Sequence, residues 1–475
     1  MMNTFFWHDY ETFGATPKSD RPAQFAGIRT DMDLNPIGDP IMLYCKPTLD
    51  AILPSLESCL ITGITPPYCE QHGVTEREFA ASIERELAAP GTIGLGYNSI
   101  RFDDEVTRFL FWRNLIDPYA REWQNNCGRW DLLDVVRGMY ALFPESLSWP
   151  HNEEGTASFK LAQLSVANGL VHENAHDALS DVRATIALAN LIKKAQPKFF
   201  DYCLNLRSKE FVRTQMCLNS KRPLLHISGM YGLARSCLAL VWPLAEHPTN
   251  KNEIIVWDLN SDPSVLLDLD AHEIKMRLFT RNDDLSNTIS RLPIKTISLN
   301  KSPFVVHDLR VLKPEHIARL NIDLDLIHRN AETARKLTLA PNLWHDVYVR
   351  DKFDNIDVDE DLYSNFLPNN DRNLLNRLRI LDGTQLALEN PRFEDRRLNE
   401  LFLRYRARNF PNSLNAEERD NWRSFCARKF NSRLESFWKE FDVMERNATE
   451  AQKNILADIR LWVVRHSLEN SEKGA

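Results

Sequence analysis

Hydrophobic and polar positions alternate in two different ways along the first third of the chain. Short runs of apolar and β-branched residues predict β-strands, and longer segments with apolar residues three and four apart predict amphipathic helices. The predicted strands cover residues 4–8, 24–30, 40–46 and 91–97. The predicted helices cover residues 76–89, 103–115, 130–142, 158–168 (with Ser158 as N-cap) and 178–195. Residues 1–195 are therefore expected to form an α/β domain with a mixed sheet that opens with a three-stranded meander.

The pattern changes twice after residue 195. Between residues 196 and 350, short β-type runs at 223–228, 253–259 and 294–299 are broken by Pro, Asn, Asp and Gly, which predicts a small β-rich domain. From residue 351 to 475, the spacing is helical. Helices are expected at residues 374–382, 395–409, 416–430, 432–445 and 449–466. A chain of 475 residues is long enough for three such domains, each with its own core.

The composition is that of an ordinary globular protein, with 43% hydrophobic and 26% charged residues. Its apolar segments are shorter than the ~20 residues needed to span a bilayer, and the N-terminus lacks the basic start of a secretory signal. The eight cysteines form no Cys-x-x-Cys pair and no Cys/His ladder at zinc spacing. We therefore expect a cytoplasmic protein with reduced, structural cysteines.

Charge is distributed unevenly between the two parts of the chain. Residues 1–195 contain 26 acidic and 16 basic residues, whereas residues 196–475 contain 40 and 42. A polyanionic substrate could reach the acidic part only through bound cations or a local basic stripe.

Four carboxylates and one histidine in the acidic part suggest a metal site. Asp9 and Glu11 are two residues apart at the end of an apolar strand, so both lie on the same face. Asp103 follows the next buried strand, and Asp181 lies early in a predicted helix, five residues after His176. Oxygen ligands suit Mg²⁺ or Mn²⁺, and two such ions can support phosphodiester hydrolysis. A nearby histidine can accept the proton of the attacking water.

Each element also has a structural interpretation. An Asp-x-Glu pair is more often a surface pair or a cap than a metal site, and Asp103 is equally compatible with a helix N-cap. The segment from His176 to Ala178 could also be a capping segment. No single element decides between these interpretations.

The order of these segments along the chain resembles a known superfamily. Residues 8–14 (HDYETFG), 61–65 (ITGIT), 97–103 (YNSIRFD) and 176–181 (HDALSD) are similar to motifs of the DEDD exonuclease superfamily, histidine subclass. Residues 101–108 (RFDDEVTR), 129–135 (RWDLLDV) and 405–411 (YRARNFP) extend the resemblance over the whole chain to the bacterial exodeoxyribonuclease I family. The resemblance implies a ribonuclease H-like exonuclease domain (1–195), an SH3-like β domain (196–350) and a helical C-terminal domain (351–475).

The same resemblance implies an activity: removal of nucleotides from the 3′ end of single-stranded DNA, giving 5′-mononucleotides, in DNA repair and recombination. Asp9, Glu11, Asp103 and Asp181 would hold two Mg²⁺ ions, with Mn²⁺ as an alternative. Glu11 would also take part in catalysis and contact the DNA, and His176 would be the general base. The family docks the acidic tail of single-stranded DNA-binding protein, and we expect a monomer.

Binding of single-stranded DNA requires cations for phosphates and flat rings for bases. Basic and aromatic residues around positions 404–433 fit either a groove wall or ordinary helix surface. Taken singly, the candidate arginines fit a solvated helix face, and Trp123 fits core packing, as well as they fit DNA contacts. The resemblance favours contacts with DNA for Arg108, Tyr119, Trp123, Arg137 and Lys160.

Two other functions are open. The same site could serve a 3′ to 5′ exoribonuclease that acts on short RNA, although such enzymes are much shorter chains. A non-catalytic module for single-stranded DNA is the second alternative, although such a module has no need to hold repelling carboxylates together. A phosphate-binding Gly-x-x-x-x-Gly-Lys-Ser/Thr loop and a Gly-x-Ser-x-Gly elbow are absent, so neither an ATPase nor a serine hydrolase is expected.

Overall fold

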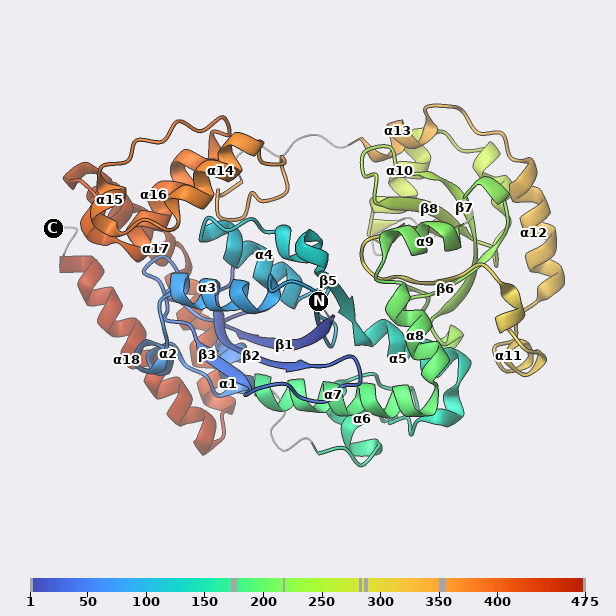
Figure 1. The fold of residues 1–475 in the computed structure, drawn as a ribbon, viewed down its shortest axis with the longest axis horizontal. Helices are drawn as coiled ribbons and strands as arrows, with labels where there is room; N and C mark the ends of the chain where they lie inside the picture. The colour runs from blue at the N-terminus through green and yellow to red at the C-terminus, as the bar shows by residue number, and fades with distance from the viewer. Residues whose placement is uncertain are drawn as a thin grey trace. The chain divides into compact units, whose positions relative to one another are not determined.

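The structure is a computed structural model that describes residues 3–171, 177–216, 218–281, 284–285, 289–349 and 356–472. The chain forms two compact units (Figure 1). The first unit contains residues 1–128, 172–186 and 354–475, and the second contains residues 129–171 and 187–353. The predicted boundaries at residues 195 and 350 remain predictions, because the chain passes between the units several times.

The sheet of the first unit has the strand order β3-β2-β1-β4-β5. β1 pairs antiparallel with β2, which pairs antiparallel with β3, and β1 also pairs parallel with β4. The predicted meander and mixed sheet are confirmed. β1 extends four residues further than expected, because Tyr10 and Thr12 continue its buried face between two acidic residues. The strands are β1 (Thr4–Thr12), β2 (Pro22–Thr30), β3 (Ile41–Tyr44), β4 (Thr92–Gly96) and β5 (Gly128–Asp131), through which the chain enters the second unit.

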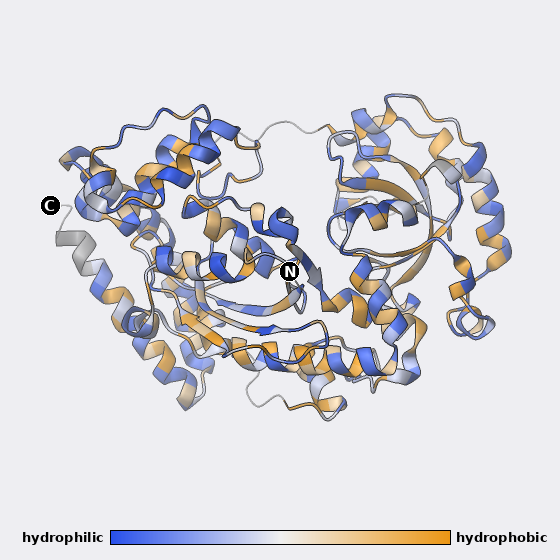
Figure 2. Cartoon of the chain, in the orientation of Figure 1, coloured by the Kyte–Doolittle hydropathy of each residue, from blue (hydrophilic) through white to orange (hydrophobic). Residues whose placement is uncertain are grey.

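An aromatic core fixes β1 in this sheet. The ring centroids of Tyr10 and Phe25 are 4.8 Å apart, and Phe79 of α3 (Glu76–Leu87) meets Phe25 edge to face at 6.3 Å. Ile83 of the same helix and Leu110 of α4 (Asp103–Arg113) belong to the same buried cluster. Figure 2 shows that hydrophobic and hydrophilic residues alternate around the helices, and that the strands of this sheet are of mixed hydropathy, unlike the mostly hydrophobic strands of the second unit.

Several helix starts differ from the sequence-based expectation. The helix expected from Trp130 begins at Leu132, because the residues before it form β5, and Asp131 then caps α5 (Leu132–Leu142) by accepting from the Leu133 N–H at 2.9 Å. The helix expected from Ser158 begins three residues later as α6 (Leu161–Ala167), with Lys160 at the N-cap position, so the predicted Ser158 cap is wrong. The predicted helix over residues 178–195 is confirmed as α7 (Ala178–Ala195).

Seven further α-helices lie in the described part of the first unit. The expected break near residue 431 is absent, because buried apolar residues continue at helical spacing through Phe430, Phe437 and Phe441. Trp462 donates from Nε1 to the Ile52 carbonyl at 3.1 Å, which joins the last helix to the N-terminal part of the chain. No helix among the described residues is both long and apolar enough to cross a membrane. These helices are α1 (Leu56–Thr62), α2 (Pro66–His72), α14 (Asn369–Leu378), α15 (Gly383–Ala387), α16 (Arg397–Asn409), α17 (Ala416–Asn447) and α18 (Glu450–Glu472).

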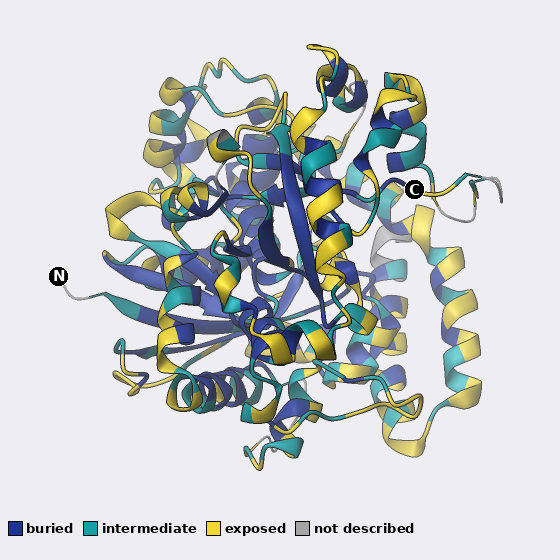
Figure 3. Cartoon of the chain, turned by 90° about the vertical axis from the view of Figure 1, so that its right-hand side faces the viewer, coloured by how far each residue is buried: buried dark blue, intermediate teal, exposed yellow. Residues whose placement is uncertain are grey.

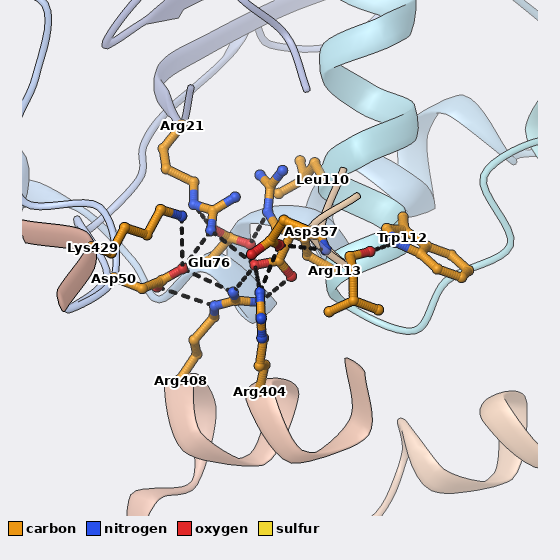
Figure 4. A network of polar contacts seen from close by, with 12 residues as sticks. Arg21, Asp50, Glu76, Leu110, Trp112, Arg113, Asp357, Arg404, Arg408 and Lys429 are labelled. Carbon is orange, nitrogen blue, oxygen red and sulfur yellow. Dashed lines mark hydrogen bonds and ion pairs between the residues drawn. The ribbon is translucent and has the colours of Figure 1, made fainter. Parts of the chain in front are cut away.

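A buried network of charges also joins the C-terminal helices to the N-terminal part of the first unit (Figure 4). Asp50, before α1, accepts from Arg21 at 2.7 Å and from Arg408 of α16 at 2.8 Å. Asp359 accepts from Arg404 at 3.0 Å and also from Arg408. The side chains of these arginines are 7% exposed or less, so they are not part of a solvated groove wall.

The second unit is built around an antiparallel sheet with the order β10-β6-β7-β8-β9. Trp242 and Trp257 lie opposite each other in this sheet, and both are buried in its core. Figure 3 shows the buried strands surrounded by partly exposed helices and loops. The further elements of this unit are α8 (Pro197–Asn205), α9 (Lys209–Met216), β6 (Leu224–Ile227), β7 (Leu238–Glu246), β8 (Glu253–Asp258), α10 (Ala271–Phe279), β9 (Ile294–Ser298), β10 (Phe304–Val306), α11 (Pro314–Arg319), α12 (Leu324–Lys336) and α13 (Leu343–Tyr348).

Candidate active site

The candidate site begins on the second half of β1. Side chains alternate between the two faces of a strand, so Asp9 and Glu11 share one face and Tyr10 lies on the other. Tyr10 is buried in the aromatic core, whereas Asp9 and Glu11 are half-buried. The core therefore fixes the strand and holds the two carboxylates together on the opposite face.

A third carboxylate comes from α7. Asp177 accepts from the backbone N–H of Ser180 at 3.1 Å, so Asp177 caps the N-terminus of this helix. One turn further, Asp181 meets the two acids of β1. One carboxylate oxygen from each of Asp9, Glu11 and Asp181 lies within 4.8 Å of the others. The structure thus brings together three of the four acids predicted to bind metal.

The fourth predicted acid, Asp103, is the first residue of α4. Its Oδ1 accepts from the backbone N–H of Tyr10 at 3.0 Å, and its side chain is almost completely buried. Tyr10 also shares a 2.9 Å hydrogen bond with Thr107 in the second turn of α4. The N-cap position is occupied by Phe102, so the alternative that Asp103 caps the helix is wrong. Asp103 instead links the start of α4 to β1 through its hydrogen bond with the Tyr10 N–H, next to Asp9.

The close approach of β4 to β1 depends on Gly96. A Cβ at this position would lie 2.5 Å from the carbonyl oxygen of His8, so a larger residue would push the two strands apart. Two residues later, Asn98 has a φ of 65°, a left-handed conformation that asparagine adopts more readily than most residues. These two positions turn the chain from β4 into α4 and so place Asp103.

Burial and mutual repulsion raise the pKa values of the acids. For Glu11, removal from water is the largest effect, followed by the charges of Asp181, Asp103 and Asp177, and together they raise its pKa to about 8. The pKa of Asp9 is raised well above its usual value by burial and then by the charge of Asp103. A cation would relieve this repulsion, and an all-oxygen ligand set suits Mg²⁺ or Mn²⁺. The residues present therefore fit the predicted metal.

The predicted general base, His176, lies outside the described residues. The described chain resumes at Asp177, which caps α7 beside the acidic cluster. The interpretation of this segment as a helix cap is therefore correct for Asp177, and the role of His176 stays a prediction.

A buried histidine on the other face of β1, and a buried ion pair near it, were not predicted. His8 is 1% exposed, and its pKa is lowered to about 4 because burial and then the charge of Arg121 disfavour protonation. Arg121 donates to Asp104 Oδ1 at 2.5 Å. Since Asp104 follows Asp103 in α4, this ion pair fixes the first turn of the helix from behind the acidic cluster.

The DNA-contact candidates of the first unit have different environments. Arg108 is buried, and its Nε donates to Glu122 at 2.7 Å while Nη1 donates to the Tyr363 hydroxyl at 3.1 Å. Its guanidinium lies 5.3 Å from the centre of the Tyr119 ring. Trp123 is 63% exposed. A solvated helix face is therefore the wrong alternative for Arg108, and core packing is the wrong one for Trp123.

The two remaining candidates belong to the second unit. Arg137 on α5 donates to Asp134 at 2.5 Å and lies against the backbone of Gly229, where a Cβ would be 2.9 Å from its Nη2. Lys160 is exposed at the start of α6. Contacts of Arg137 and Lys160 with DNA stay predictions.

Three residues of the first unit were not predicted: two lie near the DNA-contact candidates and one lies near the acidic cluster. Phe366 and Tyr363 are 81% and 54% exposed, and the ring of Phe366 lies 6.2 Å from that of Tyr119. Two aromatic residues three apart in a polar linker were the available indication. Gln24, a buried amide between apolar neighbours on β2, was the third.

The sequence matches three protein-family models. Residues 6–189 match an exonuclease family, residues 207–350 match the exonuclease I SH3-like domain, and residues 356–466 match the exonuclease I C-terminal domain. The predicted order of exonuclease, SH3-like and helical domains is therefore confirmed.

Similar proteins match over nearly the whole chain. Exodeoxyribonuclease I of Haemophilus influenzae is 42% identical over 99% of this chain and 96% of its own length. Exonuclease I of Methylocaldum szegediense has a similar structure, with a TM-score of 0.93 and 42% identity over 98% of this chain and 99% of that chain. Exonuclease I of Escherichia coli in complex with a dA16 oligonucleotide gives a TM-score of 0.93 and 39% identity, covering 98% of this chain and 100% of that chain. The chain belongs to the exodeoxyribonuclease I family.

Proposed function

We propose that this chain is a metal-dependent exonuclease that removes nucleotides from the 3′ end of single-stranded DNA and releases 5′-mononucleotides. The observation that carries this proposal is the convergence of Asp9, Glu11 and Asp181 within 4.8 Å. The E. coli relative has been solved with single-stranded oligonucleotides, which supports the choice of substrate.

Asp9, Glu11 and Asp181 would hold the metal, with Asp103 contributing from the start of α4. When bound, two Mg²⁺ ions would supply positive charge to the phosphodiester oxygens and lower the pKa of the attacking water. Mn²⁺ has similar ligand preferences. Glu11 is half-buried on β1, and it would also contact the terminal nucleotide.

His176 would be the general base: one of its ring nitrogens would accept the proton of the attacking water. Its sequence neighbour Asp177 caps α7, and Asp181 of the same helix belongs to the acidic cluster. An unperturbed histidine titrates near neutral pH, so it can accept a proton there and release it to solvent.

The DNA would be held by exposed rings and by cations. Trp123 and Phe366 are the most exposed aromatic candidates of the first unit, and Tyr119 lies beside Phe366. Exposed rings stack on bases without strong sequence preference. Arg108 is committed to Glu122 and Tyr363, so its contribution to DNA binding would be to orient Tyr119 and Tyr363. Arg137 and Lys160 would contact phosphates.

Asp9→Ala and Asp181→Ala test this function, with the exposed Asp39→Ala as a control of equal charge change. Both site variants should lose cleavage of 5′-labelled single-stranded DNA in Mg²⁺ while retaining DNA binding in Ca²⁺. Normal turnover by Asp9→Ala would overturn the proposal.

Five finer properties complete the proposal. Mg²⁺ is the expected physiological metal, and the acidic tail of single-stranded DNA-binding protein is an expected partner. We expect a cytoplasmic monomer that acts in DNA repair and recombination. The metal, the partner and the role in repair and recombination rest on the family resemblance, and the expected location rests on the sequence patterns.

A further inference from the structure

Gln24 is a buried amide at the edge of the acidic cluster. It lies on β2, and its partner in the β1–β2 ladder is Glu11. Only 1% of Gln24 is exposed. A buried amide needs partners for both its N–H groups and its oxygen, so the contacts of this side chain constrain its surroundings.

Two of its three partners lie at the start of α7, and the third, Tyr44, lies on β3. The Gln24 Nε2 donates to Asp177 Oδ1 at 3.2 Å and to the Tyr44 hydroxyl at 3.1 Å. The Gln24 Oε1 accepts from the backbone N–H of Ala178 at 3.1 Å. One side chain on β2 therefore contacts both the N-cap and the first residue of the helix that carries Asp181.

The chemistry of the two partners accounts for glutamine at this position. An ionised carboxylate such as that of Asp177 only accepts hydrogen bonds, and the N–H of Ala178 only donates one. Glutamine offers a donor and an acceptor on one planar group. Glutamate in its charged form lacks the donor, and methionine of similar length lacks both.

We propose that Gln24 is a positioning residue: it fixes the start of α7 so that Asp181 meets Glu11, and it keeps the Asp177 carboxylate in the helix cap and out of the metal site. This inference rests on the proposed function of the acidic cluster. Asp177 is close enough to the cluster for its charge to act on both Asp9 and Glu11. If it were released from the cap, it would be a fifth acid that competes for the metal and distorts the ligand set.

Loss of the two contacts between Gln24 and the start of α7 should weaken metal binding before it affects DNA binding. Partners that orient metal ligands typically contribute about 10- to 100-fold to affinity or activity. Gln24→Met preserves the length of the side chain and removes both contacts with α7, together with the contact with Tyr44. We expect its affinity for Mn²⁺ to fall about tenfold or more, with a lower kcat, an unchanged KM for DNA and unchanged DNA binding in EDTA.

A reciprocal exchange makes this test specific. Gln24→Glu places a carboxylate against Asp177 and should weaken Mn²⁺ binding, and Asp177→Asn alone should also weaken it, because two amide donors then face each other. In the double variant, the introduced amide can donate to the introduced carboxylate while the carboxylate still accepts from the Ala178 N–H. The Asn side-chain oxygen can still accept from Ser180. The double variant should therefore recover most of the lost affinity.

The readout is Mn²⁺ affinity, measured by titration calorimetry on the full chain without DNA, together with the thermal midpoint. Gln215→Met is a matched control, since Gln215 is also buried and accepts from Tyr202 at 3.1 Å, but lies in the second unit. Recovery in the double variant supports the inference. Unchanged Mn²⁺ affinity in the single variants, with or without a lower thermal midpoint, would overturn it, as would a double variant no better than either single one. Because metal binding is measured without turnover, a wild-type protein that binds Mn²⁺ but does not cleave DNA would refute the proposed function and leave this inference standing.

Discussion

Asp50 and Arg408 are 358 residues apart in the sequence, and their side chains form an ion pair of 2.8 Å that is closed to solvent. Removal of one partner leaves a buried charge without compensation, which typically costs about 3–5 kcal/mol. We expect Arg408→Ala to lower the free energy of unfolding of the first unit by that amount. Urea denaturation measures it, and exposed Arg428→Ala is the control, expected within about 0.5 kcal/mol of wild type. Equal stability of the two variants would contradict the role of the network.

Asp181→Asn should stabilise the metal-free protein while removing its metal response. Burial and the neighbouring acids raise the pKa of Glu11 to about 8, and Asp181 is the largest charged contributor. One pKa unit corresponds to about 1.4 kcal/mol. Removal of the Asp181 charge should therefore raise the free energy of unfolding of the metal-free protein by about 1 kcal/mol at pH 8. Thermal melting in EDTA should show a higher midpoint for the variant, and added Mg²⁺ should raise only the wild-type midpoint. A lower midpoint of the variant in EDTA would be evidence against repulsion in the cluster.

Metal affinity should depend on pH below pH 8. In the metal-free protein Glu11 holds a proton up to a pKa of about 8, and a bound cation must displace it. The affinity for Mn²⁺ should therefore fall as the pH falls, by about tenfold per unit between pH 8 and pH 6. Titration calorimetry in two buffers with different ionisation enthalpies should detect the released proton at pH 7. A constant affinity from pH 6 to pH 8 would rule out the protonated cluster.

His8 should make the folded protein sensitive to acid. Its pKa is about 4 in the folded state and near 6.5 in the unfolded chain, so the unfolded state binds more protons between these values. The contribution of His8 to the free energy of unfolding is complete above pH 6.5. It falls by up to about 3 kcal/mol as the pH drops to 4. His8→Gln should show a shallower loss of stability over this range in urea denaturation. The acids of the cluster titrate in both proteins, so parallel curves would refute the assignment to His8.

Short local patterns in the sequence predicted the convergence of three carboxylates that the structure shows. The alternation of Asp9 and Glu11 on a strand, and the helix that begins near Ala178, place their carboxylates without knowledge of distant contacts. The motif order then indicated that Asp103 and Asp181 belong to the same site. The exact helix starts were harder to predict, because Asp131 and Ser158 are both plausible caps and only the tertiary context selects between strand and helix.

Long-range polar contacts could not be predicted. Arg404 and Arg408 are basic residues on a helix, a pattern that is typical of exposed surface, and nothing near them in the sequence indicates that Asp359 and Asp50 neutralise them. Gln24 shows the same difficulty: its partner Asp177 lies 153 residues away. Burial of a polar residue is evident from the sequence only when its partner is local.

The proposed activity of this protein is metal-dependent removal of nucleotides from the 3′ end of DNA. The most direct test is digestion of a 5′-labelled single-stranded DNA and of the matching RNA, in Mg²⁺ and in EDTA. Wild type, His176→Ala and, as a control, exposed His151→Ala should be compared. We expect a ladder of 5′-labelled products that shortens from the 3′ end on DNA alone, requires Mg²⁺ and is slowed only by His176→Ala. Equal or faster loss of RNA, or DNA binding without cleavage, would contradict the account.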